Sequence, residues 1–142
     1  IRDENSTADL AFYAYRGMAG CDWKPFVKAA IERNPVSIEK AGSMSIDQVY
    51  QWLCRMGDDS IYDSHRLAQP DEVANYNTGD GLEKAFTLAN IIRARGPSRP
   101  VELIVADRVV TLHAETEYRF SSNKALTNRV IISETGDIEV RG

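Results

Sequence analysis

The chain has 142 residues, of which 43% are hydrophobic, and its 17 basic and 21 acidic residues give a formal net charge of −4. This length and composition predict one domain, residues 1–142, with a single hydrophobic core. The charges are interspersed and form no basic stripe along which a phosphate backbone could lie, so we expect no nucleic-acid partner. No apolar run approaches the roughly 20 residues of a membrane span, so we expect no membrane insertion.

Two helices are predicted in the first 45 residues. The first runs over about 6–18 with a Ser or Thr cap, and the second runs over 22–33, where Asn34-Pro35 ends it. We expect residues 1–45 to form a helical extension or lid on a core that spans 46–142.

A third helix is predicted from Ser45 to about Met56, with Ser45 as its cap. Cys54 lies in this amphipathic segment, and we expect it to be a small buried side chain, because free cysteines usually are. The polar loop that follows, residues 57–78, contains a short predicted helical turn at 71–75.

The segment from Gly79 to Gly96 pairs a sharp turn with an apolar helix. Gly79-Asp80-Gly81 is a turn sequence. After it, apolar residues recur at helical spacing: Leu82, Ala85, Phe86, Leu88, Ala89 and Ile92. The first turn of such a helix leaves backbone N–H groups free, which favours an anion or a nucleophile at that end.

The chain after Gly96 is rich in β-branched and aromatic residues. Strands are predicted at 101–105, 109–120, 129–133 and 138–140. Turns are predicted at Asp107-Arg108 and at 135–137, and a connection begins at 121–123. Helices followed by an antiparallel meander predict an α+β fold in which the N-terminal helices pack on the sheet.

The turn and helix resemble the nucleophile segment of the transglutaminase-like superfamily, within the wider papain-like thiol enzymes. The matching residues are Gly79, Asp80, Glu83, Lys84, Ala85, Leu88, Ala89 and Gly96. The approach to the turn, Ile61-Tyr62-Asp63 and Gln69 to Val73, is also similar. The resemblance covers roughly residues 46–134 and implies a transglutaminase-like core. It places Gly81 where this superfamily has its catalytic cysteine.

The resemblance also implies the other catalytic positions. His113-Ala114 resembles the start of the strand that carries the catalytic His. Glu134 and Asp137 follow the third predicted strand and are the candidates for the acid that orients the His. Asn128 is an alternative orienting residue.

Glycine has no side chain that could attack a carbonyl. We therefore expect a catalytically inactive transglutaminase-like domain that serves as a binding or scaffold module within a larger protein, with a protein or peptide ligand. The alternative is a thiol hydrolase or acyl transferase that acts on amide or peptide bonds. In it, either Cys21, which precedes the second helix, is the nucleophile, or Gly81 replaces a natural Cys. A third possibility is a purely structural domain.

We expect no cofactor and no metal. The chain has only two cysteines, too few for a zinc site of the Cys-rich kind. His113, Glu115 and Glu117 alternate along one predicted strand face, a spacing that is more typical of a solvated surface than of a metal site. His113-Ala114-Glu115 also matches the His-x-Glu of zinc deaminases, but the downstream Cys pair of those enzymes is missing.

Overall fold

The computed structural model of the protein describes residues 18–141. Within this range the elements are α2 (Lys24–Glu32), α3 (Pro35–Ala41), α4 (Ile46–Arg55), α5 (Pro70–Tyr76), α6 (Gly81–Arg95), β1 (Val101–His113), β2 (Glu117–Ile132) and β3 (Ile138–Val140). The strands form an antiparallel sheet in the order β1-β2-β3. The predicted α+β class is therefore confirmed. None of the described helices is both long and apolar enough to cross a membrane.

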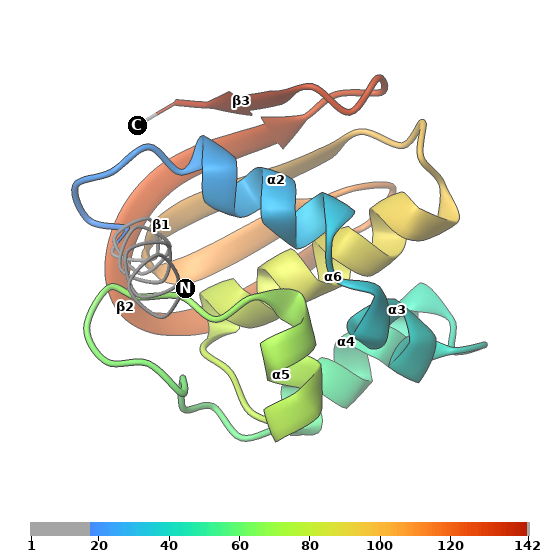
Figure 1. Cartoon of the computed structure of the whole chain (residues 1–142), viewed down its shortest axis with the longest axis horizontal. Helices are drawn as coiled ribbons and strands as arrows, with labels where there is room; N and C mark the ends of the chain where they lie inside the picture. Colours follow the sequence, from blue (N-terminus) through green and yellow to red (C-terminus); the bar gives the residue numbers. More distant parts are fainter. Residues whose placement is uncertain (1–17, 142) are drawn as a thin grey trace, which may run out of the picture.

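Helix α6 lies at the centre of the molecule. It packs on β1 and β2 on one side, and α2, α3, α4 and α5 contact its other sides. Figure 1 shows the long β1–β2 hairpin curving behind α6, with α2 crossing in front of it. Every residue of α6 from Gly81 to Arg93 is buried. The helix is therefore the element around which the core is built, and its apolar residues pack into one cluster with those of the sheet.

Several polar residues of α6 are buried with it, and each needs a hydrogen-bond partner because an unpaired polar group in the core is costly. Asn90 donates to the carbonyl of Asn34 and to the hydroxyl of Ser37, both at 2.9 Å. Thr87 donates its hydroxyl proton to the carbonyl of Glu83 one turn earlier. Asn90 thereby fixes α3 against the middle of α6.

Helix α3 was not predicted from the sequence, because Pro35 was interpreted only as the end of the preceding helix. In the structure Pro35 is the first residue of α3, a position where its missing N–H costs nothing. The free N–H groups of this short helix find their acceptor in a residue far away in the sequence. The Asp71 carboxylate accepts hydrogen bonds from the backbone N–H groups of Val36 and Ser37 at 3.1 and 2.7 Å. Asp71 belongs to α5, so this contact joins two helices.

The other predicted helices agree with the structure to within two residues. Ser45 caps α4 through a reciprocal capping box with Gln48, and α5 extends the predicted turn at 71–75. Helix α2 begins at Lys24, two residues after the predicted start. The predicted helix over 6–18 lies, apart from Met18, outside the described residues.

The strand boundaries were predicted less well. The chain reverses at residues 114–116, within the predicted strand 109–120, and β1 continues through the predicted turn at Asp107. Strand β2 likewise continues past Ser121, but its register with β1 shifts, so that residues 122–125 bulge opposite residue 108. Asp107 and Ala125 adopt positive φ angles at this irregularity.

Replacement of Asp71 by alanine should lower the free energy of unfolding by about 1–3 kcal/mol, because the buried N–H groups at the start of α3 lose their acceptor. Urea denaturation of the two proteins measures the difference. Asp59→Ala is the control, since Asp59 is exposed and its loss should change stability by less than about 0.5 kcal/mol. Equal stability of Asp71→Ala and the parent chain would contradict the proposed role of this contact.

Candidate functional site

The N-terminus of α6 is closed by its own capping residues. The Asp80 carboxylate accepts from the N–H of Leu82 at 2.9 Å, and the Glu83 carboxylate accepts from the N–H of Asp80 at 2.7 Å. Asp80 also accepts from the Ser122 hydroxyl at 2.6 Å and from the N–H of Asn123 at 2.7 Å. The same carboxylate therefore caps the helix and holds the bulge of β2 against it.

Gly81 follows this cap and lies directly against the backbone of β2. A Cβ atom built at Gly81 would lie 2.0 Å from the carbonyl oxygen of Ser121 and 3.0 Å from the Cβ of Phe120. The first of these distances is far inside van der Waals contact. Strand β2 thus occupies the space that a side chain at position 81 would need, and a cysteine could enter only if the strand moved.

Glu83 is fully buried below the cap. Its second carboxylate oxygen accepts from the Ser60 hydroxyl and from the N–H of Ala68, both at 2.6 Å. Burial raises the pKa of Glu83, while these hydrogen bonds and the positive charge of Lys124 oppose the rise. The carboxylate serves as a common acceptor for α6 and for the loop before α5.

Two lysines hold the same loop from either side. Lys84 is buried, and its Nζ donates to Asp58 at 2.9 Å, which lowers the pKa of that exposed carboxyl. Nζ of Lys124 donates to the carbonyl of Tyr62 at 2.8 Å. Burial lowers the pKa of Lys124, and the nearby carboxylates of Glu83 and Asp80 oppose that shift. These charged groups therefore form structural contacts between the loop, α6 and β2.

A cleft of about 310 Å³ opens beside Gly81. Its walls are Cys54, Asp58, Gly81, Lys84, Arg119, Phe120, Ser121 and Asn123. Asp58 and Asn123 also line a neighbouring hollow of about 410 Å³. The cleft lies between α4, the start of α6 and β2, and it offers the guanidinium of Arg119 and the amide of Asn123 to a ligand. We call it the α6 cleft.

The structure does not bring His113 to this cleft. His113 is the last residue of β1, 41% exposed, with Nε2 lying 3.6 Å from a carboxylate oxygen of Glu117. Ser121, which contacts Gly81, pairs with Val109 on β1. His113 is four residues further along β1, which corresponds to about 13 Å at the usual rise of a strand.

The candidate acids also lie away from Gly81. Glu134 and Asp137 are exposed residues of the turn between β2 and β3, where Asp137 accepts from the hydroxyl of Thr135 at 3.0 Å. Asn128 lies on β2, and its side-chain oxygen accepts from the next N–H, that of Arg129. The turn approaches Arg93, twelve residues after Gly81 on α6, or about 18 Å along the helix. Gly81, His113 and the acids therefore do not form one catalytic group in this arrangement.

The two cysteines lie in different environments. Cys21 is half-buried before α2, and burial together with the charge of Asp22 raises its pKa. A higher pKa leaves less thiolate at neutral pH, the opposite of an activated nucleophile. Cys54 is exposed on α4 and lines the α6 cleft. The prediction that Cys54 is buried was wrong, because α4 turns Val49 and Leu53 into the core instead.

Arg119, Asn123 and Cys54 were not recognised as cleft residues from the sequence. Arg119 and Asn123 could have been grouped with Ser121 by strand alternation, had the hairpin turn been placed correctly. Val49 and Leu53 are four residues apart on α4 and share its buried side, which leaves Cys54 off that side. Their spacing was the available signal for the outward position of Cys54.

Within residues 18–141, no group of three or more His, Cys, Asp or Glu residues is arranged to hold a metal ion. Comparison of the chain with models of protein families, with curated proteins and with solved structures found no match. The role of the α6 cleft therefore has to be inferred from its geometry.

Replacement of Gly81 by alanine should lower the free energy of unfolding by about 3 kcal/mol or more, since the added methyl overlaps the Ser121 backbone. Thermal and urea denaturation measure the loss. Gly20→Ala is the matched control, because among the described residues, apart from the chain neighbours of Gly20, no atom lies within 4 Å of a Cβ built there. If both variants were as stable as the parent chain, β2 would not occupy the space that a side chain at position 81 needs.

Replacement of Glu83 by glutamine should destabilise the chain by about 1–3 kcal/mol, because an amide cannot accept from all the donors that the carboxylate serves. The pKa of Glu83 is raised in the folded state. The contribution of its ionisation to stability should therefore fall as the pH rises from the ordinary glutamate value of about 4.3 through the folded value.

The measurement is the free energy of unfolding of the parent chain minus that of Glu83→Gln at a series of pH values, with exposed Glu134→Gln as the control. The difference for Glu83 should decrease across this window, and the control measures what loss of a carboxylate does at an exposed position. A difference that grows with pH would mean that Glu83 has a lowered pKa.

Proposed function

We propose that this chain is a catalytically inactive transglutaminase-like domain, and that it acts as a binding module whose ligand, a protein or peptide segment, occupies the α6 cleft. The observation that carries the proposal is the closed position at Gly81, where a Cβ would lie 2.0 Å from the Ser121 carbonyl oxygen. A nucleophile is the one part that a thiol mechanism cannot lack. The remaining cleft offers binding groups without a reactive side chain at that position.

The chemistry of the α6 cleft supports a peptide ligand. Arg119 projects into solvent, its side chain 71% exposed, and can donate to a carboxylate or a backbone carbonyl. Asn123 can both donate and accept, which suits a peptide group. Phe120 lies in the same wall, but its ring packs on Tyr50 in the core. A few polar groups that converge on one cleft are typical of sites that fix the orientation of a ligand.

The binding test is selection of a phage-displayed random peptide library on the immobilised chain. Peptides that bind the α6 cleft should lose at least tenfold in affinity for Arg119→Glu, since the cleft loses its exposed cation. They should keep their affinity for the control Arg108→Glu, which makes the same charge change at an exposed residue of β1 outside the cleft. Equal binding to the parent chain and Arg119→Glu would place the ligand elsewhere and contradict the proposal.

The alternative function, a thiol enzyme with Cys21 as nucleophile, predicts the opposite order of thiol reactivity. On the proposed function, exposed Cys54 should react with iodoacetamide at neutral pH faster than half-buried Cys21, whose pKa is raised. Mass spectrometry of the peptides at successive times measures both rates. Cys54→Ser and Cys21→Ser assign each phase.

Rapid and selective alkylation of Cys21, with parallel loss of hydrolysis of an amide substrate, would favour the enzyme. A fast-reacting thiol in Gly81→Cys would instead indicate that the shell of a thiol site is intact around position 81. The closed geometry at position 81 leads us to expect a destabilised Gly81→Cys chain whose new thiol has ordinary reactivity.

A further inference from the structure

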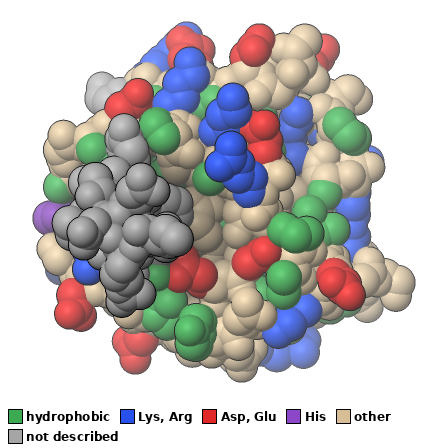
Figure 2. Space-filling model, viewed as in Figure 1, with side chains coloured by type: hydrophobic (Ala, Val, Ile, Leu, Met, Phe, Trp, Pro, Cys, Tyr) green, Lys and Arg blue, Asp and Glu red, His purple; other side chains and the backbone are tan. Residues whose placement is uncertain are grey.

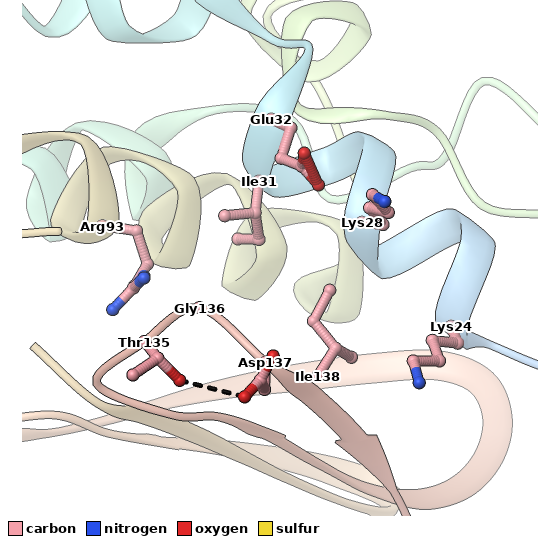
Figure 3. Close-up of a pocket in the computed structure, with 9 residues that line it drawn as sticks. All are labelled: Lys24, Lys28, Ile31, Glu32, Arg93, Thr135, Gly136, Asp137 and Ile138. Atoms are coloured by element: carbon pink, nitrogen blue, oxygen red, sulfur yellow. Dashed lines mark hydrogen bonds between the residues drawn. The ribbon is translucent and has the colours of Figure 1, made fainter. Parts of the chain in front are cut away.

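Another cavity lies at the other end of α6, between α2 and the turn that joins β2 to β3 (Figure 3). Its volume is about 530 Å³, within the range of about 300–1,000 Å³ that is usual for small-molecule sites. The lining residues are Lys24, Lys28, Ile31, Glu32, Arg93, Thr135, Gly136, Asp137 and Ile138. We call it the α2 pocket.

Three cations from two helices line this pocket. Lys24 and Lys28 are four residues apart on α2 and therefore lie on the same side of that helix. Figure 2 shows Lys and Arg side chains, with an acidic side chain among them, over the part of the surface where α2 lies. Neither lysine forms an ion pair with any residue in the part of the chain that the structure describes. Both lysines are exposed residues of α2.

Arg93 is the third cation, and it is built into the pocket wall with only 8% of its surface exposed. Its Nη1 donates to the carbonyls of Arg99 and Ser133 at 2.7 and 3.2 Å. Its Nε is buried and has no hydrogen-bond partner among the described residues. Its Nη2 lies beside the turn, 3.2 Å from where a Cβ at Gly136 would be.

The partners of Arg93 are neutral carbonyls, and no carboxylate among residues 18–141 pairs with it. A buried charge without a counter-charge is costly, and the attraction of an anion is strongest where water is partly excluded. An anionic group in the α2 pocket would provide the missing counter-charge. Gly136, the residue of the turn next to Nη2, adds no side chain of its own there.

Two carboxylates also line the pocket. Asp137 accepts from the hydroxyl of Thr135, as Figure 3 shows, and Glu32 is an exposed residue at the end of α2. Three cations against these two acids leave the lining with a formal charge of +1, although the whole chain carries −4. Ile31 and Ile138 supply an apolar surface. The ligand should therefore combine an anionic group with a body that is neutral or partly apolar.

We propose that the α2 pocket binds a small organic anion. Its carboxylate or phosphate group is attracted by Arg93 at one end of the pocket and by Lys24 and Lys28 on α2, and its body packs on Ile31 and Ile138 (Figure 3). The site is separate from the α6 cleft, about 18 Å away along the helix, and does not depend on the function proposed for that cleft.

The test is titration of the ¹⁵N-labelled chain with inorganic phosphate and, separately, with succinate, at constant ionic strength, followed by NMR. Saturable shifts are expected at the amide of Gly136 and along α2. Lys24→Ala with Lys28→Ala should raise the dissociation constant at least tenfold. The variants replace exposed side chains, so both chains should stay folded, which the spectra report directly. The probe that binds more tightly identifies the anionic group of the ligand.

The control is a chain with Arg33→Ala and Arg108→Ala, which removes two exposed positive charges outside the pocket. It should bind both probes as the parent chain does. Equal weakening in the control would show a general effect of net charge and would overturn the proposal. So would shifts that do not saturate with either probe, or saturable shifts confined to residues outside the pocket.

Discussion

The burial of α6 on every side is the constraint on which the rest of the structure depends. An amphipathic helix can leave its polar residues in water, but α6 cannot, because the sheet and four helices enclose it. Glu83 therefore holds the loop before α5, Asn90 holds α3, and Arg93 holds the end of β2. The neighbouring segments thus pack on α6 and also form hydrogen bonds with its polar residues. Both kinds of contact require the same arrangement of these segments, which favours one fold over alternative packings.

The residues that carry the resemblance to thiol enzymes have structural roles in this fold. Asp80 and Glu83 form a capping box, and each also accepts bonds from another segment. Lys84 pairs with Asp58 below the helix. Such contacts are needed for folding whether or not the helix carries a nucleophile. A sequence match at these positions is therefore good evidence for a capped, buried helix and weak evidence for chemistry. Position 81 bears on the chemistry directly, and there β2 lies in the place of a side chain.

The elements that could be predicted from sequence are those whose signals are local. Ser45 and the period of the apolar residues specify α4 and α6 within a few residues. Helix α3 was missed because its cap comes from Asp71, 34 residues away from Ser37. The hairpin was misplaced because apolar alternation continues through the turn at 114–116 with no Gly or Pro to mark it. The bulge at 122–125 depends on the contact with Asp80. These long-range contacts also decide that His113 lies far from Gly81, so a proposed triad could not be tested before the strand register was known.

The two ends of α6 differ in how their charges are compensated, and this difference separates the two proposed sites. At the N-terminal end, Asp80 serves the free N–H groups and Asp58 pairs with Lys84. The affinity of a ligand at this end would come mainly from the shape of the cleft, from neutral hydrogen bonds and from the exposed Arg119. At the C-terminal end, the helix dipole and two carbonyls offset part of the charge of Arg93, but no carboxylate among the described residues completes the balance. On the proposal for the α2 pocket, an anion bound there would supply part of this missing negative charge, although the chain as a whole is acidic.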